Sequence, residues 1–230
     1  MWLESAGLAR RLRPGQFLNV KVGPGLDPLL RRPISVADVA GDRLRLVFRV
    51  VGRGTEAMSQ LRRGDVLDVL GPLGKPAPLP RRGDVIVVGG GIGIAPLLFL
   101  CRVLTGQRPQ VFLGARTKEQ LVLRREFHLL GVEPELVTDD GSMGRRGFVP
   151  EPAADAVRRA QRPVVYACGP RSMLADLVRR VDPAPVWGFI EERMGCGTGI
   201  CYCCALPKRG GGFVRFCKEG PVVLLNEAML

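Results

Sequence analysis

Four cysteines near the C-terminus restrict what this part of the chain can fold around. They are Cys196, Cys201, Cys204 and Cys217. The first three follow a Cys-x4-Cys-x2-Cys pattern and the fourth comes after twelve further residues, which is the spacing of plant-type [2Fe–2S] sites. Gly195, Gly197 and Gly199 allow the loop to turn sharply and bring amide N–H groups close to the sulfurs. The pattern therefore predicts an iron–sulfur cluster and one-electron transfer.

Other uses of these thiols remain to be weighed. A structural zinc is one, but zinc ribbons usually combine two Cys-x2-Cys pairs, and the x4 gap does not match them. Cys203 adds a surplus thiol inside the loop, and its choice over Cys204 would change the spacing to x4-x1. A disulfide framework is disfavoured because no signal peptide opens the chain and 230 residues can bury a core without cross-links.

Composition narrows the classes of function. Hydrophobic residues make up 46% of the chain, which predicts a globular protein, and seven cysteines without secretory features predict the cytoplasm. The uncharged stretch 85–101 is short for a membrane span, and glycines and Pro96 interrupt it. The net charge is +12, but the basic residues are scattered pairs and aromatic content is only 6%. We therefore expect no nucleic-acid and no membrane partner, while an acidic protein partner stays possible.

The first third of the chain, residues 1–80, reads as a β domain. Short alternating or β-branched runs at 17–22, 43–51 and 66–70 are separated by Gly and Pro turns, with one short helical stretch at 56–61. This pattern predicts an antiparallel β-barrel. Three prolines and an Arg-Arg-Gly run within 75–83 predict a linker at its end.

From Asp84 onward strands and helices alternate. We expect strands at 85–88, 110–113, 135–138 and 164–167, and helices at 96–104, 119–130, 152–160 and 172–181. Such alternation predicts a parallel sheet covered on both faces. The fold class is therefore multidomain, with a β-barrel at 1–80, an α/β nucleotide-binding domain at 81–186 and a small cysteine-rich domain at 187–230. Few core residues are evident in this last segment, so we expect it to be buried against a partner.

Two motifs in the β domain have phosphate-binding chemistry. Arg31-Arg32-Pro33-Ile34-Ser35 follows a loop and is expected to precede a strand, and a guanidinium of this kind can hold a pyrophosphate in a bidentate manner. Gly52-Arg53-Gly54-Thr55 follows some twenty residues later, where glycines permit close backbone approach. Each motif alone is usually just a turn, but in a barrel ahead of a nucleotide domain the two together indicate a cofactor.

Glycines lie where several strands of the α/β domain end. Gly89-Gly90-Gly91-Ile92-Gly93-Ile94-Ala95-Pro96 joins the first strand to the first helix, as in dinucleotide-binding turns, although it is not a strict G-x-G-x-x-G. Gly114-Ala115-Arg116, Asp139-Asp140-Gly141-Ser142 and Cys168-Gly169-Pro170 end later strands. Ligands of open sheets bind at this edge. For a dinucleotide we select the following residues: Gly90, Gly91, Gly93, Arg116, Asp140, Cys168 and Gly169.

Acid–base catalysis has little support in the sequence. His128 is the only histidine and lies on a predicted helix, where a surface or packing role is expected. We therefore predict no catalytic side chain.

The chain has a flavin-type barrel, a nucleotide domain and a cluster segment, in that order. It resembles the ferredoxin-NADP⁺ reductase superfamily, and within it the electron-transfer subunits of type B dihydroorotate dehydrogenases. The runs that carry the resemblance include Arg32-Pro33-Ile34-Ser35, Gly71-Pro72-Leu73-Gly74, Gly90–Pro96 and Glu191-Glu192-Arg193-Met194-Gly195-Cys196-Gly197. The resemblance implies that FAD is bound by the following residues: Arg32, Pro33, Ile34, Ser35, Val47, Phe48, Arg49, Gly54 and Thr55. It also implies that Cys196, Cys201, Cys204 and Cys217 hold the cluster. The chain departs from the family pattern at Ile34, where the superfamily often has Tyr, at 75–78 after Gly-Pro-Leu-Gly, and at Gly188.

The resemblance further implies a place in pyrimidine biosynthesis. Dihydroorotate would be oxidised on FMN in a separate catalytic subunit, within a heterotetramer of two plus two. Electrons would pass through the [2Fe–2S] cluster and FAD to NAD⁺. Two alternatives remain: a related NAD(P)H-dependent flavin subunit serving ferredoxin, sulfide or hydrogenase chemistry, which Arg116 could support by binding a 2′-phosphate, and a zinc-stabilised nucleotide-binding regulator.

Overall fold

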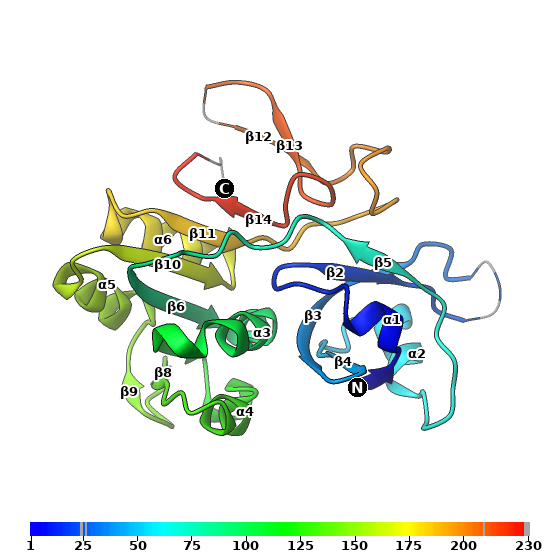
Figure 1. The fold of residues 1–230 in the computed structure, drawn as a ribbon, viewed down its shortest axis with the longest axis horizontal. Coiled ribbons are helices and arrows are strands. Elements are labelled where there is room, and N and C mark those ends of the chain that lie inside the picture. Colours follow the sequence, from blue (N-terminus) through cyan, green and yellow to red (C-terminus); the bar gives the residue numbers. More distant parts are fainter. Residues whose placement is uncertain (24, 26, 209, 228–230) are drawn as a thin grey trace.

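The computed structural model describes residues 1–23, 25, 27–208 and 210–227. The N-terminal part is a five-stranded antiparallel sheet in the order β1-β4-β3-β2-β5 (Figure 1). Its strands are β1 Trp2–Glu4, β2 Phe17–Val20, β3 Arg32–Ala40, β4 Arg43–Leu46 and β5 Val69–Leu73. Two short helices, α1 Ala6–Ala9 and α2 Arg53–Ser59, accompany it. Bulges in the β2–β5 and β3–β4 ladders bend the sheet, and its concave side is filled by buried aliphatic side chains.

Several strand limits differ from the sequence prediction. The Arg-Pro-Ile-Ser run does not precede a strand, because β3 begins at Arg32 itself. The strand expected at 43–51 ends at Leu46, and the one expected at 66–70 lies at Val69–Leu73. Val66 is 93% exposed, so its β-branched character does not mark a strand here. Pairing with β2, rather than local propensity, decides where β5 lies.

The second part is a seven-stranded sheet in the order β14-β11-β10-β6-β7-β8-β9. Its strands are β6 Asp84–Gly90, β7 Gln110–Ala115, β8 Glu135–Thr138, β9 Arg145–Arg146, β10 Pro163–Cys168, β11 Val186–Phe189 and β14 Val222–Leu224. All neighbours are parallel except β11 and β14. The strand order reverses at the β6–β10 pair, and in open α/β sheets ligands bind at such a point.

Helices cover both faces of this sheet, as the alternation predicts. They are α3 Ile94–Leu104, α4 Arg124–Leu129, α5 Pro150–Arg159 and α6 Arg171–Val181. Along β6, Val85 and Val87 pack with α3 and α4, while Ile86 and Val88 pack with α5 and α6. The predicted helix at 119–130 is wrong in its first half, because a 3₁₀ turn Lys118–Gln120 is followed by a break at Leu123, whose φ is +63°.

The cysteine-rich segment forms a small lobe at one end of the molecule (Figure 1). It contains the hairpin β12 Ala205–Pro207 and β13 Phe213–Arg215, and then returns to the seven-stranded sheet as β14. A domain limit at 186/187 would thus fall inside β11. The lobe has more buried residues than its sequence suggested: Cys204, Val214, Phe216 and Cys217 are buried, and they share one hydrophobic cluster with the α5–α6 face of the sheet.

The β domain and the nucleotide domain are tied together at several points. Phe99 of α3 lies in the hydrophobic cluster of the five-stranded sheet. The predicted linker is an ordered strap, since Ala77 donates its N–H to Pro14 O over 2.7 Å and Tyr166 donates its hydroxyl to Pro78 O over 2.5 Å. Lys75 N–H reaches Gly220 O at 2.6 Å, so the strap also contacts the cysteine-rich lobe.

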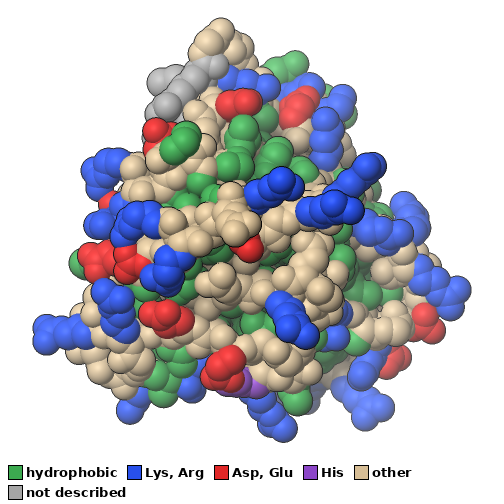
Figure 2. All heavy atoms as spheres, turned by 60° about the vertical axis from the view of Figure 1, so that its left-hand side comes forward, with side chains coloured by type: hydrophobic (Ala, Val, Ile, Leu, Met, Phe, Trp, Pro, Cys, Tyr) green, Lys and Arg blue, Asp and Glu red, His purple; other side chains and the backbone are tan. Residues whose placement is uncertain are grey.

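Charged side chains are spread over the molecule. Figure 2 shows Lys and Arg across the whole face viewed, interspersed with Asp and Glu. Among the described residues, no helix has the length and apolar character needed to cross a bilayer.

Candidate functional site

The four motif cysteines lie in the lobe as two hydrogen-bonded pairs. Cys196 N–H donates to Cys201 Sγ at 3.4 Å, and Cys201 N–H donates back to Cys196 Sγ at 3.5 Å. Cys217 N–H donates to Cys204 Sγ at 3.4 Å. A two-iron cluster takes two thiolates on each iron, and a two-and-two arrangement fits that demand.

Backbone amides make this loop suited to thiolates. Thr198 N–H also donates to Cys196 Sγ, at 3.3 Å, and Gly197 and Gly199 have the positive φ values, +74° and +88°, that this turn requires. Although burial raises the pKa of Cys196, the hydrogen bonds from Cys201 and Thr198 outweigh it and lower that pKa to about 5. Burial, with a further contribution from Cys204, raises the pKa of Cys217 to about 12. Iron binding would displace that proton.

Cys203 stands apart from the two pairs. Its side chain is exposed, and its Sγ contacts Arg193 O at 3.5 Å. Cys201 is exposed as well, whereas Cys204 and Cys217 are buried. One pair therefore lies at the surface of the lobe and the other in its interior.

The two motifs of the β domain meet in space. A Cβ added to Gly54 would overlap with the Arg32 guanidinium, so this arginine lies directly over the glycine turn. Arg31, by contrast, is engaged by both carboxylate oxygens of Asp68, each at 2.9 Å. Arg32 donates one N–H group to Leu30 O but forms no ion pair among the described residues, so its other N–H groups can serve an anion, as a pyrophosphate group would require. This cradle fits the phosphate part of FAD.

Thr55 serves the turn with its side chain. Its hydroxyl accepts N–H groups from Val51 at 2.9 Å and Gly52 at 3.2 Å, and donates to Gly52 O. Any contact of Thr55 with a cofactor would therefore come from its backbone. Pro33, Ile34 and Ser35 lie along β3, opposite β2.

A cavity of about 540 Å³ lies where β6, β7 and β10 end. Its lining includes Gly90, Gly91 and Arg116, which the sequence predicted, together with Gly114, Asp139 and Met173. Arg49, assigned to FAD by resemblance, also lines it, and its Nη2 would lie 3.9 Å from a Cβ at Gly91. The cavity therefore combines glycine backbone and arginine side chains, as a dinucleotide pyrophosphate needs.

The other predicted nucleotide residues lie beside this cavity. A Cβ at Gly93 would come within 2.7 Å of the Cys168–Gly169 peptide, so Gly93 permits close packing of the turn on β10. Asp140 lies in a turn, where its Oδ1 accepts Ser142 N–H and Oγ at 2.9 and 2.7 Å; these bonds lower its pKa. Asp139, not Asp140, lines the cavity.

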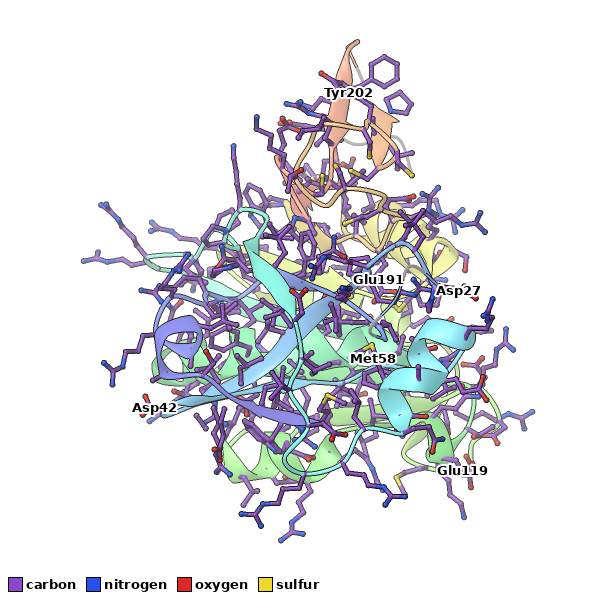
Figure 3. The ribbon with its side chains drawn as sticks, turned by 90° about the vertical axis from the view of Figure 1, so that its right-hand side faces the viewer. Asp27, Asp42, Met58, Glu119, Glu191 and Tyr202 are labelled. Atoms are coloured by element: carbon purple, nitrogen blue, oxygen red, sulfur yellow. The ribbon has the colours of Figure 1, made fainter. Side chains whose placement is uncertain are left out.

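Cys168 is fully enclosed at the end of β10. Burial, and secondarily the neighbouring Glu191, raises its pKa well above the ordinary value. Burial also raises the pKa of Glu191 itself, which Arg49 partly offsets. Glu191 lies where the cysteine-rich lobe joins the rest of the chain (Figure 3). His128 is on α4 and contacts Glu133 over 2.6 Å.

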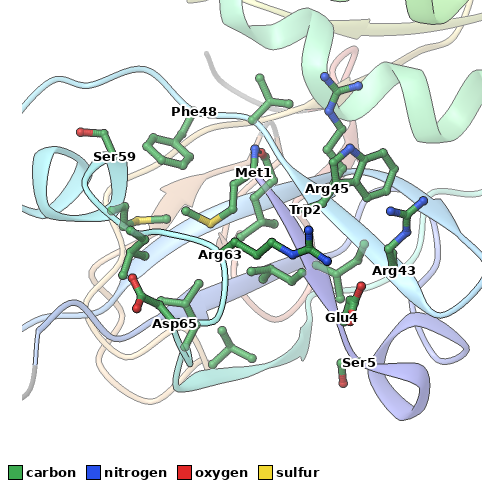
Figure 4. Close-up of a pocket in the computed structure, with 18 of the residues that line it drawn as sticks. Met1, Trp2, Glu4, Ser5, Arg43, Arg45, Phe48, Ser59, Arg63 and Asp65 are labelled. Carbon is green, nitrogen blue, oxygen red and sulfur yellow. The ribbon is translucent and has the colours of Figure 1, made fainter.

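A larger hollow of about 1450 Å³ occupies another side of the β domain (Figure 4). Val47 and Phe48 line it, with the first residues of the chain, the segment after α2 and the start of α4. Neither Arg32 nor Gly54 is among its lining residues, and the contacts of Val47 and Phe48 with FAD stay a prediction. Arg45 there pairs with Glu126 at 2.8 Å and lies over the Trp2 ring.

Some cavity residues escaped the sequence analysis. Met173 and Asp176 lie in the first two turns of α6, directly after the Cys168-Gly169-Pro170 turn. Their position after a strand that ends in glycine could have suggested them. Nothing in the sequence around Arg49 indicates that it lines this cavity. It reaches the cavity only because the β domain packs on the α/β domain.

Two family models match the chain. An oxidoreductase NAD-binding domain matches residues 87–179, and the iron–sulfur cluster binding domain of dihydroorotate dehydrogenase B matches residues 191–228. The cofactor predictions, a [2Fe–2S] cluster, FAD and NAD(H), are confirmed by these models and by the fold.

Several curated relatives are similar over most of their length. The electron transfer subunit of dihydroorotate dehydrogenase B (NAD(+)) from Desulforamulus reducens is 42% identical, covering 96% of this chain and 88% of the relative. The same subunit from Bacillus caldolyticus is 40% identical, with coverages of 98% and 91%. The Enterococcus faecalis subunit is 40% identical, with coverages of 95% and 87%.

Solved structures agree on the architecture. A structure of an NADH-dependent reduced ferredoxin-NADP oxidoreductase superposes with a TM-score of 0.86 at 32% identity, covering 99% of this chain and 83% of that one. An Amycolatopsis cytochrome P450 reductase superposes with a TM-score of 0.62 at 26% identity, covering 75% and 59%. The fold class is thus the ferredoxin-reductase type that the sequence predicted. By sequence and by fold, this chain belongs to the family of dihydroorotate dehydrogenase B (NAD(+)) electron transfer subunits.

Proposed function

We propose that this chain takes electrons from an FMN-containing catalytic subunit, where dihydroorotate is oxidised, and delivers them to NAD⁺. The observation that carries the proposal is the pairing of Cys196 with Cys201 and of Cys204 with Cys217 in one lobe, which packs on the α/β sheet. Among the described residues, no three His, Cys, Asp or Glu side chains converge as a single ion would require. This favours a two-iron cluster over the zinc-stabilised regulator.

The order of the cofactors follows from their chemistry. The cluster exchanges single electrons, the nicotinamide accepts hydride, and flavin does both, so FAD belongs between them. In this chain, Arg32 and the Gly54 turn would hold the FAD phosphates, with Ser35 and its neighbours on β3 beside the ring. Gly90, Gly91 and Arg116 would hold the dinucleotide, whose nicotinamide would lie toward the end of β10, where Cys168 stands. These residues bind and orient, and we assign none of them as a general acid or base.

The surface of the cysteine-rich lobe suits a protein partner. Ile200 is 79% exposed, Phe213 69% and Tyr202 59%, and Tyr202 lies at the far end of the lobe (Figure 3). Large apolar side chains gathered on one small lobe indicate an interaction surface. We propose that the catalytic subunit covers it, in an assembly of two subunits of each kind. We also propose the cytoplasm as its location, since all seven cysteines are free thiols.

The matched variants Cys201→Ser and Cys203→Ser test the ligand set. With the catalytic subunit present, Cys201→Ser is expected to abolish both the iron–sulfur absorption and dihydroorotate-dependent NADH formation, because an exposed ligand is lost. Cys203→Ser, two residues away, is expected to keep both. Visible spectra before and after addition of dihydroorotate measure the outcome. Full retention of cluster and activity in Cys201→Ser would refute the ligand assignment.

A second candidate function is supported by the likeness to the NADH-dependent reduced ferredoxin-NADP oxidoreductase. The same cofactors could serve a ferredoxin-linked reaction, and Arg116 in the cavity could bind a 2′-phosphate. Bleaching of the flavin and cluster bands by NADPH but not by dihydroorotate would favour this reading. Bleaching by dihydroorotate with a preference for NADH would favour the first.

A further inference from the structure

Asn19 is a buried polar residue in the middle of the β domain. It is only 1% exposed and lies on β2, between Pro33 of β3 and Leu70 of β5. Its neighbours Leu18 and Val20 face the core of the five-stranded sheet. Because side chains alternate along a strand, Asn19 points to the opposite face. Phe17, on that same face, packs in the cluster shared with the cysteine-rich lobe.

The amide of Asn19 reaches the cysteine loop. Its Nδ2 donates to the carbonyl oxygen of Cys196 at 3.3 Å, across 177 residues of sequence. A Cβ at Gly197 would lie 2.7 Å from Nδ2 and 3.3 Å from Leu73 Cδ1. The peptide after the first cysteine therefore lies directly on β2 and β5, and Gly197 is required there for closeness as well as for its φ of +74°.

The other end of the same amide has no partner among the residues that the structure describes. Asn19 Oδ1 is buried and accepts no hydrogen bond from any of them. If the amide were flipped, Oδ1 would face the carbonyl oxygen of Cys196, and two acceptors cannot form a hydrogen bond. The contact with the loop therefore determines the orientation of the Asn19 amide. A buried acceptor without a hydrogen bond destabilises the folded state. Stability alone would favour an apolar residue here, and the asparagine is best explained by what its N–H group does.

We propose that Asn19 is a positioning residue that holds Cys196, the first cysteine of the cluster loop, against strand β2 of the β domain. The inference rests on the proposed function, since it takes Cys196 as a cluster ligand. By fixing the Cys196 carbonyl, Asn19 keeps the following amides aimed at Cys196 Sγ, namely Thr198 N–H at 3.3 Å and Cys201 N–H at 3.5 Å. Amide hydrogen bonds to sulfur favour the reduced cluster. The backbone of Asn19 pairs with Pro33 in the flavin motif and its side chain reaches Cys196, so one residue links the two cofactor sites.

The test compares Asn19→Leu with Asn226→Leu. Asn226 makes the same kind of contact elsewhere, donating Nδ2 to Ala184 O at 3.3 Å. The readout is the midpoint potential of the cluster in the cofactor-loaded protein, followed by electron paramagnetic resonance during redox titration. We expect the equilibrium constant for cluster reduction to fall about tenfold in Asn19→Leu, which is a shift of about 59 mV to lower potential. The control should keep the potential of the unmodified protein.

A second variant and a clear baseline keep the test decisive. If Asn19→Leu does not fold, Asn19→Ala replaces it, because a smaller side chain removes the donor without adding bulk. An unchanged potential in the folded Asn19 variant, with normal flavin and cluster spectra, would overturn the inference alone. Absence of a reduced [2Fe–2S] signal in the unmodified protein would instead refute the proposed function.

Discussion

At the scale of single residues, the junction between the lobe and the rest of the chain changes the chemistry of one carboxyl. Glu191 keeps contact with solvent, yet protein surrounds its carboxyl on most sides and burial raises its pKa. Arg49 reaches the same region from the β domain and Cys168 from the α/β domain. Three segments that are distant in the sequence therefore meet at this position, and the neighbouring Glu192 instead forms an ion pair with Arg171.

The raised pKa predicts a pH-dependent stability. Folded Glu191 binds its proton more tightly than the unfolded chain does, so its contribution is full below the ordinary pKa of 4.5 and is lost as the pH rises through the folded value. Glu191→Gln is therefore expected to raise the melting temperature at pH 7–8, by about 1–3 °C given its partial exposure, and to have little effect near pH 4. Glu192→Gln should lower it at neutral pH. Equal effects of Glu191→Gln at both pH values would contradict this account.

At the scale of elements, α3 serves two domains at once. It covers one face of the α/β sheet and places Phe99 in the cluster of the β domain. Arg102 of α3 donates two hydrogen bonds, of 2.5 and 2.6 Å, to the carboxylate of Asp38 on β3. The Asp38 side chain is only 3% exposed and that of Arg102 is 39% exposed, so a buried carboxylate is held by a partly exposed arginine where the two cofactor-binding domains meet.

Removing the arginine should cost far more than a surface ion pair. Arg102→Ala leaves a buried carboxylate without its partner, and we expect the free energy of unfolding to fall by about 3 kcal/mol or more. The matched control is Arg158→Ala, whose pair with Asp155 is exposed and should change that energy by less than about 1 kcal/mol. Urea unfolding of the cofactor-loaded chain measures both. Similar values for the two variants would show that the α3–β3 pair does not stabilise the interface.

At the scale of the whole molecule, the cysteine-rich lobe is anchored at one end and free at the other. Its buried pair, Cys204 and Cys217, shares a core with the sheet, and β14 then adds to the sheet beside β11. The other pair lies on the exposed loop. The sheet thus holds the base of the lobe, and we expect the loop to depend on the cluster.

Removal of iron should therefore loosen the lobe unevenly. In hydrogen-exchange measurements on loaded and chelator-treated protein, we expect amide protection to fall strongly over residues 194–204. Val222–Leu224 should keep their protection, because their ladder with β11 does not involve the cluster. The α/β strands provide the internal control. An equal loss of protection over Val222–Leu224 would mean that the cluster, rather than the sheet, holds this strand.

Much of the architecture could be read from local patterns. Strand and helix alternation after Asp84 predicted the parallel sheet, because strands buried on both faces read as short continuous apolar runs, such as 85–88, separated by segments of helical length. The β domain was less well predicted: β1 and the start of β3 were missed, and β5 was displaced, because pairing across the sheet overrides the weak propensity of short runs. The prediction of a helix at 119–130 was wrong at Leu123, because a left-handed backbone conformation leaves no mark on the hydrophobic periodicity.

The sequence by itself determined the cluster motif, the glycine turns and the family, because each depends on residue type at a fixed spacing along the chain. Only the tertiary structure decided which side chains meet. It set Arg32 over Gly54, brought Arg49 to the nucleotide cavity and placed Asp139 there in preference to Asp140. It also pressed Asn19 against the loop of Cys196 across 177 residues. Such contacts depend on how sheets and helices pack, and no spacing within one segment encodes the distance between two segments that fold together.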